Sequence, residues 1–401
     1  MIEEKSKATL IYNAKIVLQQ EIIENGYVLI EKGCIACIGT KEAYETDHVR
    51  AGPAEQIFNG LVVDAQEGWL LPGFIDIHVH GGNGSDFMEA GISSLDQITQ
   101  FHGRHGTTAM LATTVTASKQ DIEQVLSAVH QYQQTPMPNA QLFGVHLEGP
   151  FLSPKWPGAQ NPAYIVKPNL EWMDKWIGQY PDLIRMVTLA PETDGAMELI
   201  RLLHQHRIIP ACGHSDANYK TMLEAQENGL CHAVHTFNAM TPLHHREPGT
   251  VGAILTTDSI SAEVIADGHH VHPAVIRMMS KLKTAQNMIL ITDAISAAGL
   301  GDGDYELGGL KVYVKEGTAR LKSTNSLAGS TLTMIQAFKY MVQQVGLSIS
   351  QASEMASGNP AKLLGIDSMT GSIAAGKQAD LVFVSTNFDI CHVWVKGKMI
   401  H

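Results

Sequence analysis

The sequence has no excess of positive charge. Its 401 residues include 28 lysines and arginines against 40 aspartates and glutamates, which gives a formal net charge of −12. Proteins that bind nucleic acid or an anionic membrane surface present a basic face, and this composition offers none. We therefore expect no nucleic acid and no membrane among the partners. An anionic ligand would have to be met by a few locally placed charges.

Long apolar runs are also missing. No stretch reaches the roughly 18 consecutive apolar residues that a membrane-spanning helix requires. The first residues, MIEEKSKATLIYNAKIV, are charged and then strand-like, and they lack the apolar core of a secretory signal peptide. These two absences lead us to expect a cytoplasmic protein.

Cysteine is scarce and scattered, with five in the whole chain. Cys34 and Cys37 do form a C-x-x-C, but residues three apart on an extended strand face opposite sides. We therefore interpret both as small strand residues rather than as a redox or zinc motif.

Both ends of the chain look β-rich. Short strand-like runs with glycine-containing turns fill the first 70 residues and the last 30, as expected for strands joined by tight connections. The two terminal segments could pair into one small β-domain, with the middle of the chain inserted between them.

The middle of the chain alternates between two patterns. Eight apolar, strand-like runs begin near residues 74, 108, 142, 184, 208, 231, 260 and 288, and helix-like stretches separate most of them. Ser118 stands ahead of one such stretch, with Asp121 three residues on, as at a helix start. This rhythm predicts an α/β fold of the (β/α)8 TIM-barrel type. A doubly wound sheet is the competing fold, but HVHGGNGSDF carries no G-x-G-x-x-G.

Side chains that can bind metals stand where these predicted strands end. In the run FIDIHVHGG, Asp76, His78 and His80 alternate with apolar residues and so face one way. The complete set of strand-end candidates is His78, His80, Glu148, His214, His235 and Asp293. A single histidine on an apolar strand is usually a hydrogen-bonded core residue. Six such groups at the carboxyl ends of barrel strands would need a common partner, and a divalent cation supplies one.

Several motifs resemble those of the amidohydrolase superfamily and, within it, of the N-acetylglucosamine-6-phosphate deacetylases. LPGFIDIHVHGG and GSIAAGKQADLVFV are general to the superfamily, whereas HLEGPF, HHREPG and LAGS are more specific to the deacetylases. The resemblance runs from about residue 70 to residue 384. It implies a metal-dependent (β/α)8 barrel at residues 72–371 and a small β-sandwich domain built from residues 1–71 and 372–401.

The resemblance also implies an activity. The expected reaction is hydrolysis of the N-acetyl group of N-acetylglucosamine 6-phosphate, giving glucosamine 6-phosphate and acetate in amino-sugar catabolism. Glu148, His214 and His235 would hold one divalent metal, and His78 and His80 a second, with Glu148 bridging. Because the H-x-H pair is intact, we expect two metals rather than the single one of some members. Zinc or iron is expected first, with manganese or cobalt also compatible with these ligands.

Further residues receive roles by the same resemblance. Asp293 would act as general base and then as general acid. Arg246 would reach the phosphate from a neighbouring subunit, which implies a homodimer, and arginine suits phosphate because its planar fork donates two hydrogen bonds. His270 would touch the sugar or its carbonyl group. The other expected substrate contacts are Ala159, Asn238, Ala239, Leu327, Ala328, Gly329 and Ser330. Gln160 stands where many members have a histidine, so its role is open.

Two alternatives remain at this point. Another amidohydrolase, such as an N-acyl-amino-acid deacetylase or a cyclic amidase, would keep the metal ligands and lack the phosphate contacts. A non-catalytic scaffold would keep the barrel, but such proteins usually lose ligands, and all six ligand-type residues are present here.

Overall fold

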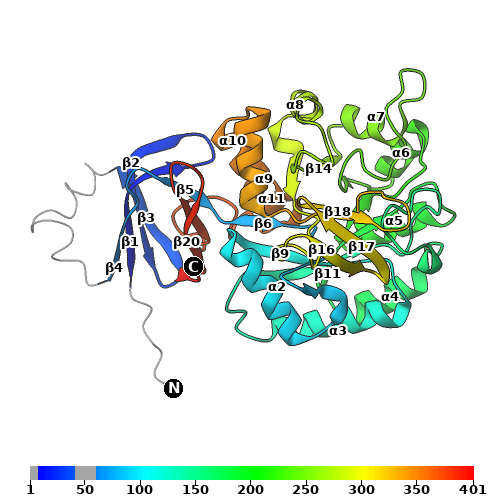
Figure 1. Ribbon diagram of the computed structural model, residues 1–401, viewed down its shortest axis with the longest axis horizontal. Helices are drawn as coiled ribbons and strands as arrows, with labels where there is room; N and C mark the ends of the chain where they lie inside the picture. Colours follow the sequence, from blue (N-terminus) through cyan, green and yellow to red (C-terminus); the bar gives the residue numbers. More distant parts are fainter. Residues whose placement is uncertain (1–7, 41–59) are drawn as a thin grey trace, which may run out of the picture.

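The computed structural model describes residues 8–40 and 60–401. Two eight-stranded sheets dominate these residues (Figure 1), one built from both ends of the chain and one from its middle. The expectation for the N-terminal segment falls in part on residues 1–7 and 41–59, which lie outside the described residues. The boundaries at residues 72 and 372 stay a prediction.

The middle of the chain forms the predicted barrel. Its strands pair in parallel, each with its neighbour along the chain. They are β6 (Phe74–Asp76), β9 (Thr107–Thr114), β10 (Gln141–Glu148), β11 (Ile184–Leu189), β12 (Ile209–Cys212), β13 (His232–Ala233), β14 (Ser261–Ile265) and β15 (Met288–Ile291). Nearly every strand residue is buried, because helices cover the outside and side chains fill the inside. The (β/α)8 prediction is confirmed.

The first and last barrel strands meet just beyond their ends. The amide of Asp293 donates to the carbonyl of His78 at 2.8 Å, and the amide of His80 donates to the carbonyl of Ala294 at 2.8 Å. Below them, the buried carboxylate of Asp76 accepts from the hydroxyl of Thr292 at 2.6 Å. This seam closes the barrel with the same segments that carry His78, His80 and Asp293.

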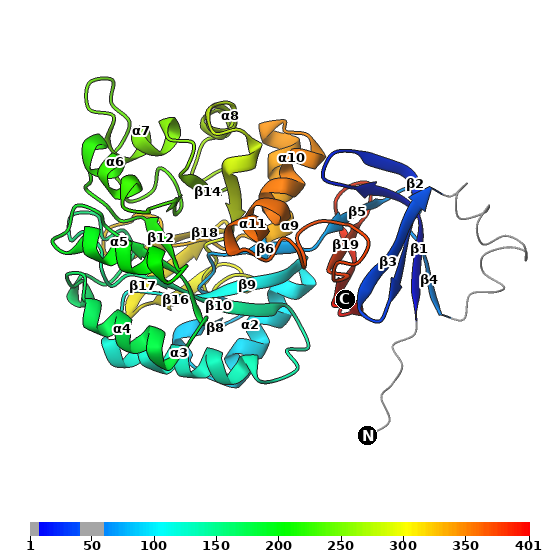
Figure 2. The same ribbon diagram turned by 180° about the vertical axis from the view of Figure 1, so that it is seen from behind.

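Helices surround the barrel (Figure 2). They are α2 (Ile92–Arg104), α3 (Lys119–Gln133), α4 (Leu170–Gln179), α5 (Ala196–Gln205), α6 (Tyr219–Glu227), α7 (Gly249–Thr256), α8 (Pro273–Leu282), α9 (Met334–Tyr340), α10 (Ile349–Ser353) and α11 (Asn359–Leu364). The predicted start of α3 is confirmed, since the Ser118 hydroxyl accepts from the Asp121 amide at 3.2 Å, which satisfies one of the unpaired N–H groups of the first turn. Among the described residues, none of these helices has the length and apolar character needed to cross a membrane.

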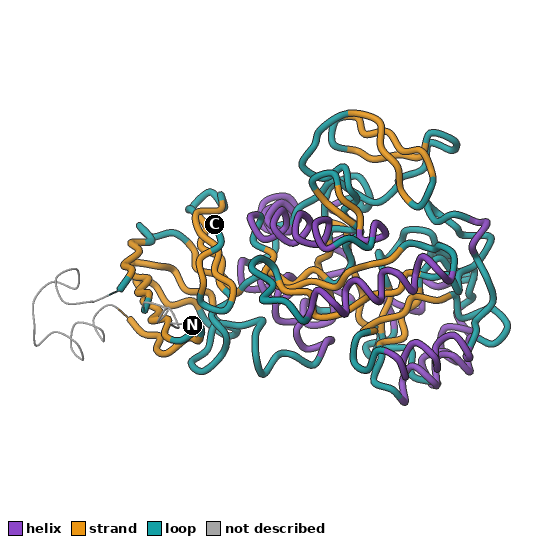
Figure 3. Tube along the Cα trace, turned by 90° about the horizontal axis from the view of Figure 1, so that it is seen from below, coloured by secondary structure: helices purple, strands orange, loops and turns teal. Residues whose placement is uncertain are grey.

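The second sheet unites the chain ends. It contains β1 (Thr9–Val17), β2 (Ile22–Glu31), β3 (Cys34–Thr40), β4 (Leu61–Asp64), β5 (Trp69–Pro72), β19 (Leu381–Val384), β20 (Ile390–Val395) and β21 (Lys398–Met399). The sheet curls back on itself, because the Ile35 amide donates to the Lys377 carbonyl at 2.9 Å, and it encloses its own apolar core. Cys34 and Cys37 lie in β3 as free thiols. Figure 3 shows this part as strands and loops, with the helices gathered around the barrel.

A single glycine joins the two sheets. Gly73 stands between β5 and β6, and a Cβ atom there would lie 2.1 Å from the Thr108 hydroxyl oxygen. Only glycine therefore lets the chain pass directly from the small sheet into the barrel.

One element was not expected from the sequence. A three-stranded antiparallel sheet, β16 (Gly303–Leu307), β17 (Leu310–Lys315) and β18 (Thr318–Leu321), follows the last barrel strand. Its apolar face has a separate small core that includes Leu307, Val312 and Val314. This hairpin sheet lies over the carboxyl-terminal mouth of the barrel, where Leu307 lines the central cavity.

Candidate functional site

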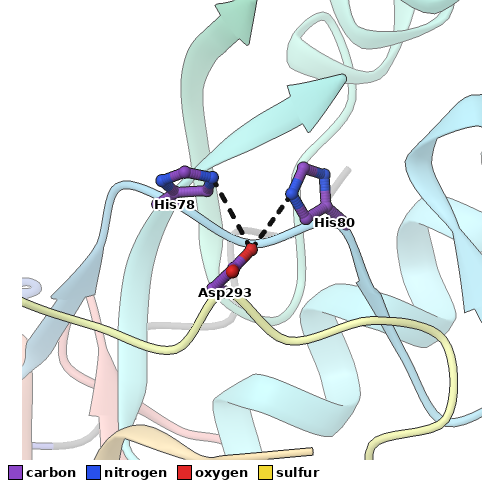
Figure 4. Close-up of side chains that lie close together, drawn as sticks. All are labelled: His78, His80 and Asp293. Atoms are coloured by element: carbon purple, nitrogen blue, oxygen red, sulfur yellow. Dashed lines mark ion pairs between the residues drawn. The ribbon is translucent and has the colours of Figure 1, made fainter. Parts of the chain in front are cut away.

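The six strand-end side chains meet at the carboxyl-terminal mouth of the barrel. Glu148 Oε1 lies 3.2 Å from His78 Nε2, 3.2 Å from His214 Nε2 and 3.0 Å from His235 Nε2. Asp293 Oδ1 lies 3.6 Å from His78 Nε2 and 3.1 Å from His80 Nε2 (Figure 4). All of these side chains are buried or nearly so. The structure thus brings together every metal-ligand candidate that the sequence offered.

Three of these residues have an unusual backbone. His214, His235 and Asp293 have φ angles of 48°, 29° and 51°, in the left-handed region that residues other than glycine rarely adopt. Such a conformation costs on the order of 1 kcal/mol or more at each residue. Each stands two residues after its strand ends, where the turn directs the side chain towards the others. Strain of this kind concentrates at functional sites.

The orientation of three imidazole rings is fixed by acceptors at Nδ1. His78 Nδ1 lies 2.9 Å from a Glu263 carboxylate oxygen, and His214 Nδ1 lies 3.0 Å from the Trp156 carbonyl. His80 Nδ1 lies 3.3 Å from the Thr113 carbonyl. Because a carbonyl or carboxylate oxygen can only accept, Nδ1 must carry the proton. Each Nε2 therefore points into the centre, where the neutral ring would offer its lone pair to a cation, as metal-binding histidines do.

The centre fits a divalent cation. Ring nitrogens and carboxylate oxygens face one another across a short gap, and His214 Nε2 and His235 Nε2 lie 3.2 Å apart. His78 Nε2 is buried 3.2 Å from Glu148 Oε1, but it makes no well-directed hydrogen bond with any of the described residues. Two overlapping groups have ligand atoms within 4.8 Å of one another, namely His78, His80 and Asp293, and His78, Glu148 and His235. Imidazole nitrogen and carboxylate oxygen are ligands for zinc, iron, manganese and cobalt, so the donor set suits the metals expected from the sequence.

The charges at this centre are strongly coupled. Burial alone would lower the pKa of His78, but the carboxylates of Glu148 and Glu263 raise it well above the ordinary value. Burial also opposes protonation of His80, yet its contacts with Asp293 and Glu148 raise the pKa to about 10. Burial would raise the pKa of Glu148 and Asp293, but the facing imidazoles lower both. Both carboxylates are therefore ionised at neutral pH, and the site favours positive charge.

Glu263 was missed by the sequence analysis. This fully buried carboxylate of β14 accepts from His78 Nδ1 at 2.9 Å, from His232 Nε2 at 3.0 Å and from the His235 amide at 3.0 Å. Glu263 therefore connects two of the candidate ligands, His78 and His235, on the side away from the centre. The available signal was the one charged residue in the strand SAEVI.

A cavity of about 320 Å³ opens above the centre. Of the predicted substrate contacts, six line it: Ala159, Asn238, Ala239, His270, Leu327 and Gly329. Ala328 and Ser330 are buried beside it, and Ser330 supports Asp293 by donating its amide to the Asp293 carbonyl at 2.7 Å. Arg246 does not line the cavity of its own chain. It is exposed, and its guanidinium lies 2.7 Å from His245 Nε2.

Gln160 contacts the centre directly. Its amide nitrogen donates to Glu148 Oε2 at 2.5 Å, and its oxygen accepts from the Thr116 amide at 2.6 Å. The side chain is buried at the cavity wall. Its amide is thus positioned to hold the Glu148 carboxylate.

Comparisons with known proteins agree with this arrangement. The model of the Amidohydrolase family matches residues 69–400. The N-acetylglucosamine-6-phosphate deacetylase of Bacillus subtilis (strain 168) is 40% identical over 400 residues, covering 98% of this chain and 97% of that protein. The N-acetylgalactosamine-6-phosphate deacetylase of Escherichia coli O157:H7 is 39% identical over 330 residues, covering 82% and 87%.

A solved structure extends the likeness to the whole fold. The N-acetyl-D-glucosamine-6-phosphate deacetylase of Mycobacterium smegmatis, a mutant in complex with N-acetyl-D-glucosamine-6-phosphate, superimposes with a TM-score of 0.89. The sequences are 31% identical, and the match covers 98% of this chain and 99% of that one.

Proposed function

Because the chain belongs to the amidohydrolase family, we propose that it hydrolyses the N-acetyl group of N-acetylglucosamine 6-phosphate. The products are glucosamine 6-phosphate and acetate, and the reaction belongs to amino-sugar catabolism. The proposal is supported above all by the convergence of four histidines and two carboxylates beneath a cavity. It is also supported by the names of the relatives that match almost the full chain.

The metal ligands we propose are His78, His80, Glu148, His214 and His235, with Asp293 beside them. Glu148 contacts imidazoles on both sides of the centre, as a bridging carboxylate would. A divalent metal at such a centre lowers the pKa of a water molecule and polarises the acyl oxygen. The number and type of these ligands suit two ions, zinc or iron first.

Asp293 moves the proton. Its low pKa keeps the carboxylate ionised at neutral pH, so it can take a proton from the attacking water. The water oxygen then bonds to the acetyl carbon. Asp293 returns the proton to the amine nitrogen as the C–N bond breaks, because an amine leaves far more readily once it is protonated. Acetate and the amino sugar result, and Asp293 is ionised again.

His270 and the cavity wall position the sugar. The Nδ1 of His270 donates to Asp267 at 2.6 Å, which leaves Nε2 as the ring nitrogen available to a hydroxyl or carbonyl of the substrate. Leu307 and Leu327 supply apolar surface at the same cavity. These contacts would hold the amide carbonyl of the substrate over the metal centre, with the sugar ring facing His270.

The phosphate is assigned to the Asn238–Ala239 turn. Phe237 and Ala239 have φ angles of 81° and 49°, a turn of the kind that can direct backbone N–H groups at an anion. The Asn238 amide already donates to the His235 carbonyl at 3.0 Å, so we assign the phosphate contact to the Ala239 amide. The exposed Arg246 of a second chain would complete this subsite in a homodimer. Such an enzyme would act in the cytoplasm, where phosphorylated sugars are metabolised.

Steady-state kinetics test the proposal. We expect kcat/KM to be highest for N-acetylglucosamine 6-phosphate, lower for its galacto epimer and lowest for the unphosphorylated sugar. Metal analysis of the purified protein should find one or two divalent ions per chain. Turnover of N-acyl amino acids or cyclic amides at a higher kcat/KM than that of the phosphosugar would refute the assignment.

A further inference from the structure

The cavity contains little fixed positive charge. Among the described residues that line it, Lys155 is the only lysine or arginine. The histidines at its floor face carboxylates, and His270 is paired with Asp267. A phosphorylated substrate carries nearly two negative charges at neutral pH, so it requires a cation that the rest of this wall lacks.

Lys155 lies on the side of the cavity where the phosphate is assigned. The turn after β10 that begins at Lys155 packs against the Asn238–Ala239 turn, because a Cβ on Gly158 would lie 3.4 Å from the Ala239 Cβ. A second contact runs through Ser215, whose amide donates to the Ala239 carbonyl at 3.1 Å. The residue after Ser215 is Asp216, the ion-pair partner of Lys155. Lys155 and the Asn238–Ala239 turn therefore belong to one wall.

Lys155 forms an ion pair that it can exchange for another anion. Lys155 Nζ lies 2.6 Å from Asp216 Oδ2, and its side chain is 72% exposed. The other Asp216 oxygen accepts from Trp156 Nε1 at 2.9 Å, so Asp216 keeps a hydrogen bond when the lysine leaves. An exposed ion pair of this kind contributes little to stability, and a phosphate dianion attracts the ammonium group more strongly than a single carboxylate does.

We propose that Lys155 is a specificity residue that binds the substrate phosphate from within the same chain. It leaves Asp216 on binding and pairs with the phosphate beside the Asn238–Ala239 turn. This inference rests on the proposed function, since it concerns the same site. Lys155 thereby accounts for part of the preference for phosphorylated over unphosphorylated sugar, independently of Arg246 from a second chain.

The test compares Lys155→Met with Lys155→Arg and with a matched control. Lys167→Met is that control, because Lys167 is equally exposed and paired, 3.1 Å from Asp194, but does not line the cavity. The quantity measured is the ratio of kcat/KM for N-acetylglucosamine 6-phosphate to kcat/KM for N-acetylglucosamine. In Lys155→Met we expect this ratio to fall roughly ten- to hundredfold, as for the loss of a hydrogen bond to a charged group. Lys155→Arg should retain most of it, and Lys167→Met all of it.

Calorimetry supplies a readout that does not depend on turnover. The affinity for the product glucosamine 6-phosphate should fall in Lys155→Met by a similar factor, while the affinity for glucosamine should not fall with it.

The outcomes separate the two proposals. If the wild-type enzyme acts on the phosphosugar and Lys155→Met keeps the ratio, Lys155 has no part in phosphate binding and the proposed function stands. Equal losses on both sugars would make Lys155 a structural residue of its loop and also overturn the inference. If the wild-type enzyme shows no activity on the phosphosugar, the proposed function fails and the role of Lys155 fails with it.

Discussion

At the scale of single residues, Asp293 has the most demanding role. In Asp293→Asn the shape of the side chain is kept, but the amide cannot take a proton from water or return it to the amine. We expect kcat to fall by roughly 10²–10⁴-fold, the range for loss of a general acid–base group. Metal content and product affinity should stay near wild type. A kcat within a few fold of wild type would remove Asp293 from the proton transfer.

Glu263 gives a second prediction at this scale. Glu263→Gln leaves one acceptor oxygen for three donors, so the His78 ring is no longer fixed with its proton at Nδ1. Loss of such a supporting contact typically weakens metal binding about ten- to hundredfold, and competition with a chelating dye measures the change.

Asp380 provides the matched control for Glu263. It is another buried carboxylate, which accepts from the Thr370 hydroxyl and the Lys396 amide, each at 2.7 Å, away from the metal centre. Asp380→Asn should leave metal affinity unchanged. Equal metal affinities for wild type and Glu263→Gln would show that the carboxylate does not orient His78.

Glu263 and Lys155 show which parts of the site the sequence alone could not predict. His78, Glu148 and Asp293 could be found because each follows a recognisable apolar strand, and parallel strands bring their ends together. Glu263 depends on a contact with His78 across 185 positions of sequence, and Lys155 depends on a pairing across 61 positions. A lone charge in a strand or loop does not indicate its partner, so neither role could be assigned before the fold was known.

At the scale of elements, the start of α3 can be tested. In Ser118→Ala the Asp121 amide loses its acceptor, and we expect the free energy of unfolding to fall by about 1 kcal/mol. Ser127 lies within the same helix, away from its ends, and its hydroxyl accepts from the Gln131 side chain at 3.3 Å, so Ser127→Ala should change stability by less than half as much. Urea melts of the metal-loaded protein give both values. Equal effects of the two substitutions would exclude a capping role.

The elements themselves were predictable to unequal degrees. Barrel strands such as β12 and β15 read as short continuous apolar runs because both of their faces are buried. The hairpin sheet β16–β18 alternates buried and exposed residues, as in Val312 and Val314 of β17. This weaker, two-residue period appears in a segment where the barrel rhythm predicts helix, so the sequence analysis did not recognise it.

At the scale of the whole molecule, the proposed homodimer gives a complementation test. Arg246→Ala and Asp293→Asn should each be nearly inactive towards the phosphosugar. If Arg246 acts across the interface, a mixed dimer has one site with an intact Asp293 that receives an intact Arg246 from its partner. Random mixing and reassembly should then restore about a quarter of wild-type activity, since half of the dimers are mixed and each has one such site.

The control is a mixture of each variant with itself, which should restore nothing. Light scattering establishes the mass of the particle in solution. A monomeric mass, or a mixture no more active than its components, would place Arg246 within its own chain or outside the site.

The seam between the first and last barrel strands has a consequence for how the protein is made. His78 and Asp293 are joined by a backbone hydrogen bond, yet a ribosome must add more than 200 residues between them. A nascent chain that ends before β15 lacks both the last strand of the barrel and the proposed acid–base group. If Asp293 transfers the proton as proposed, catalysis can begin only after the barrel has closed, and a chain truncated before Asp293 should be inactive.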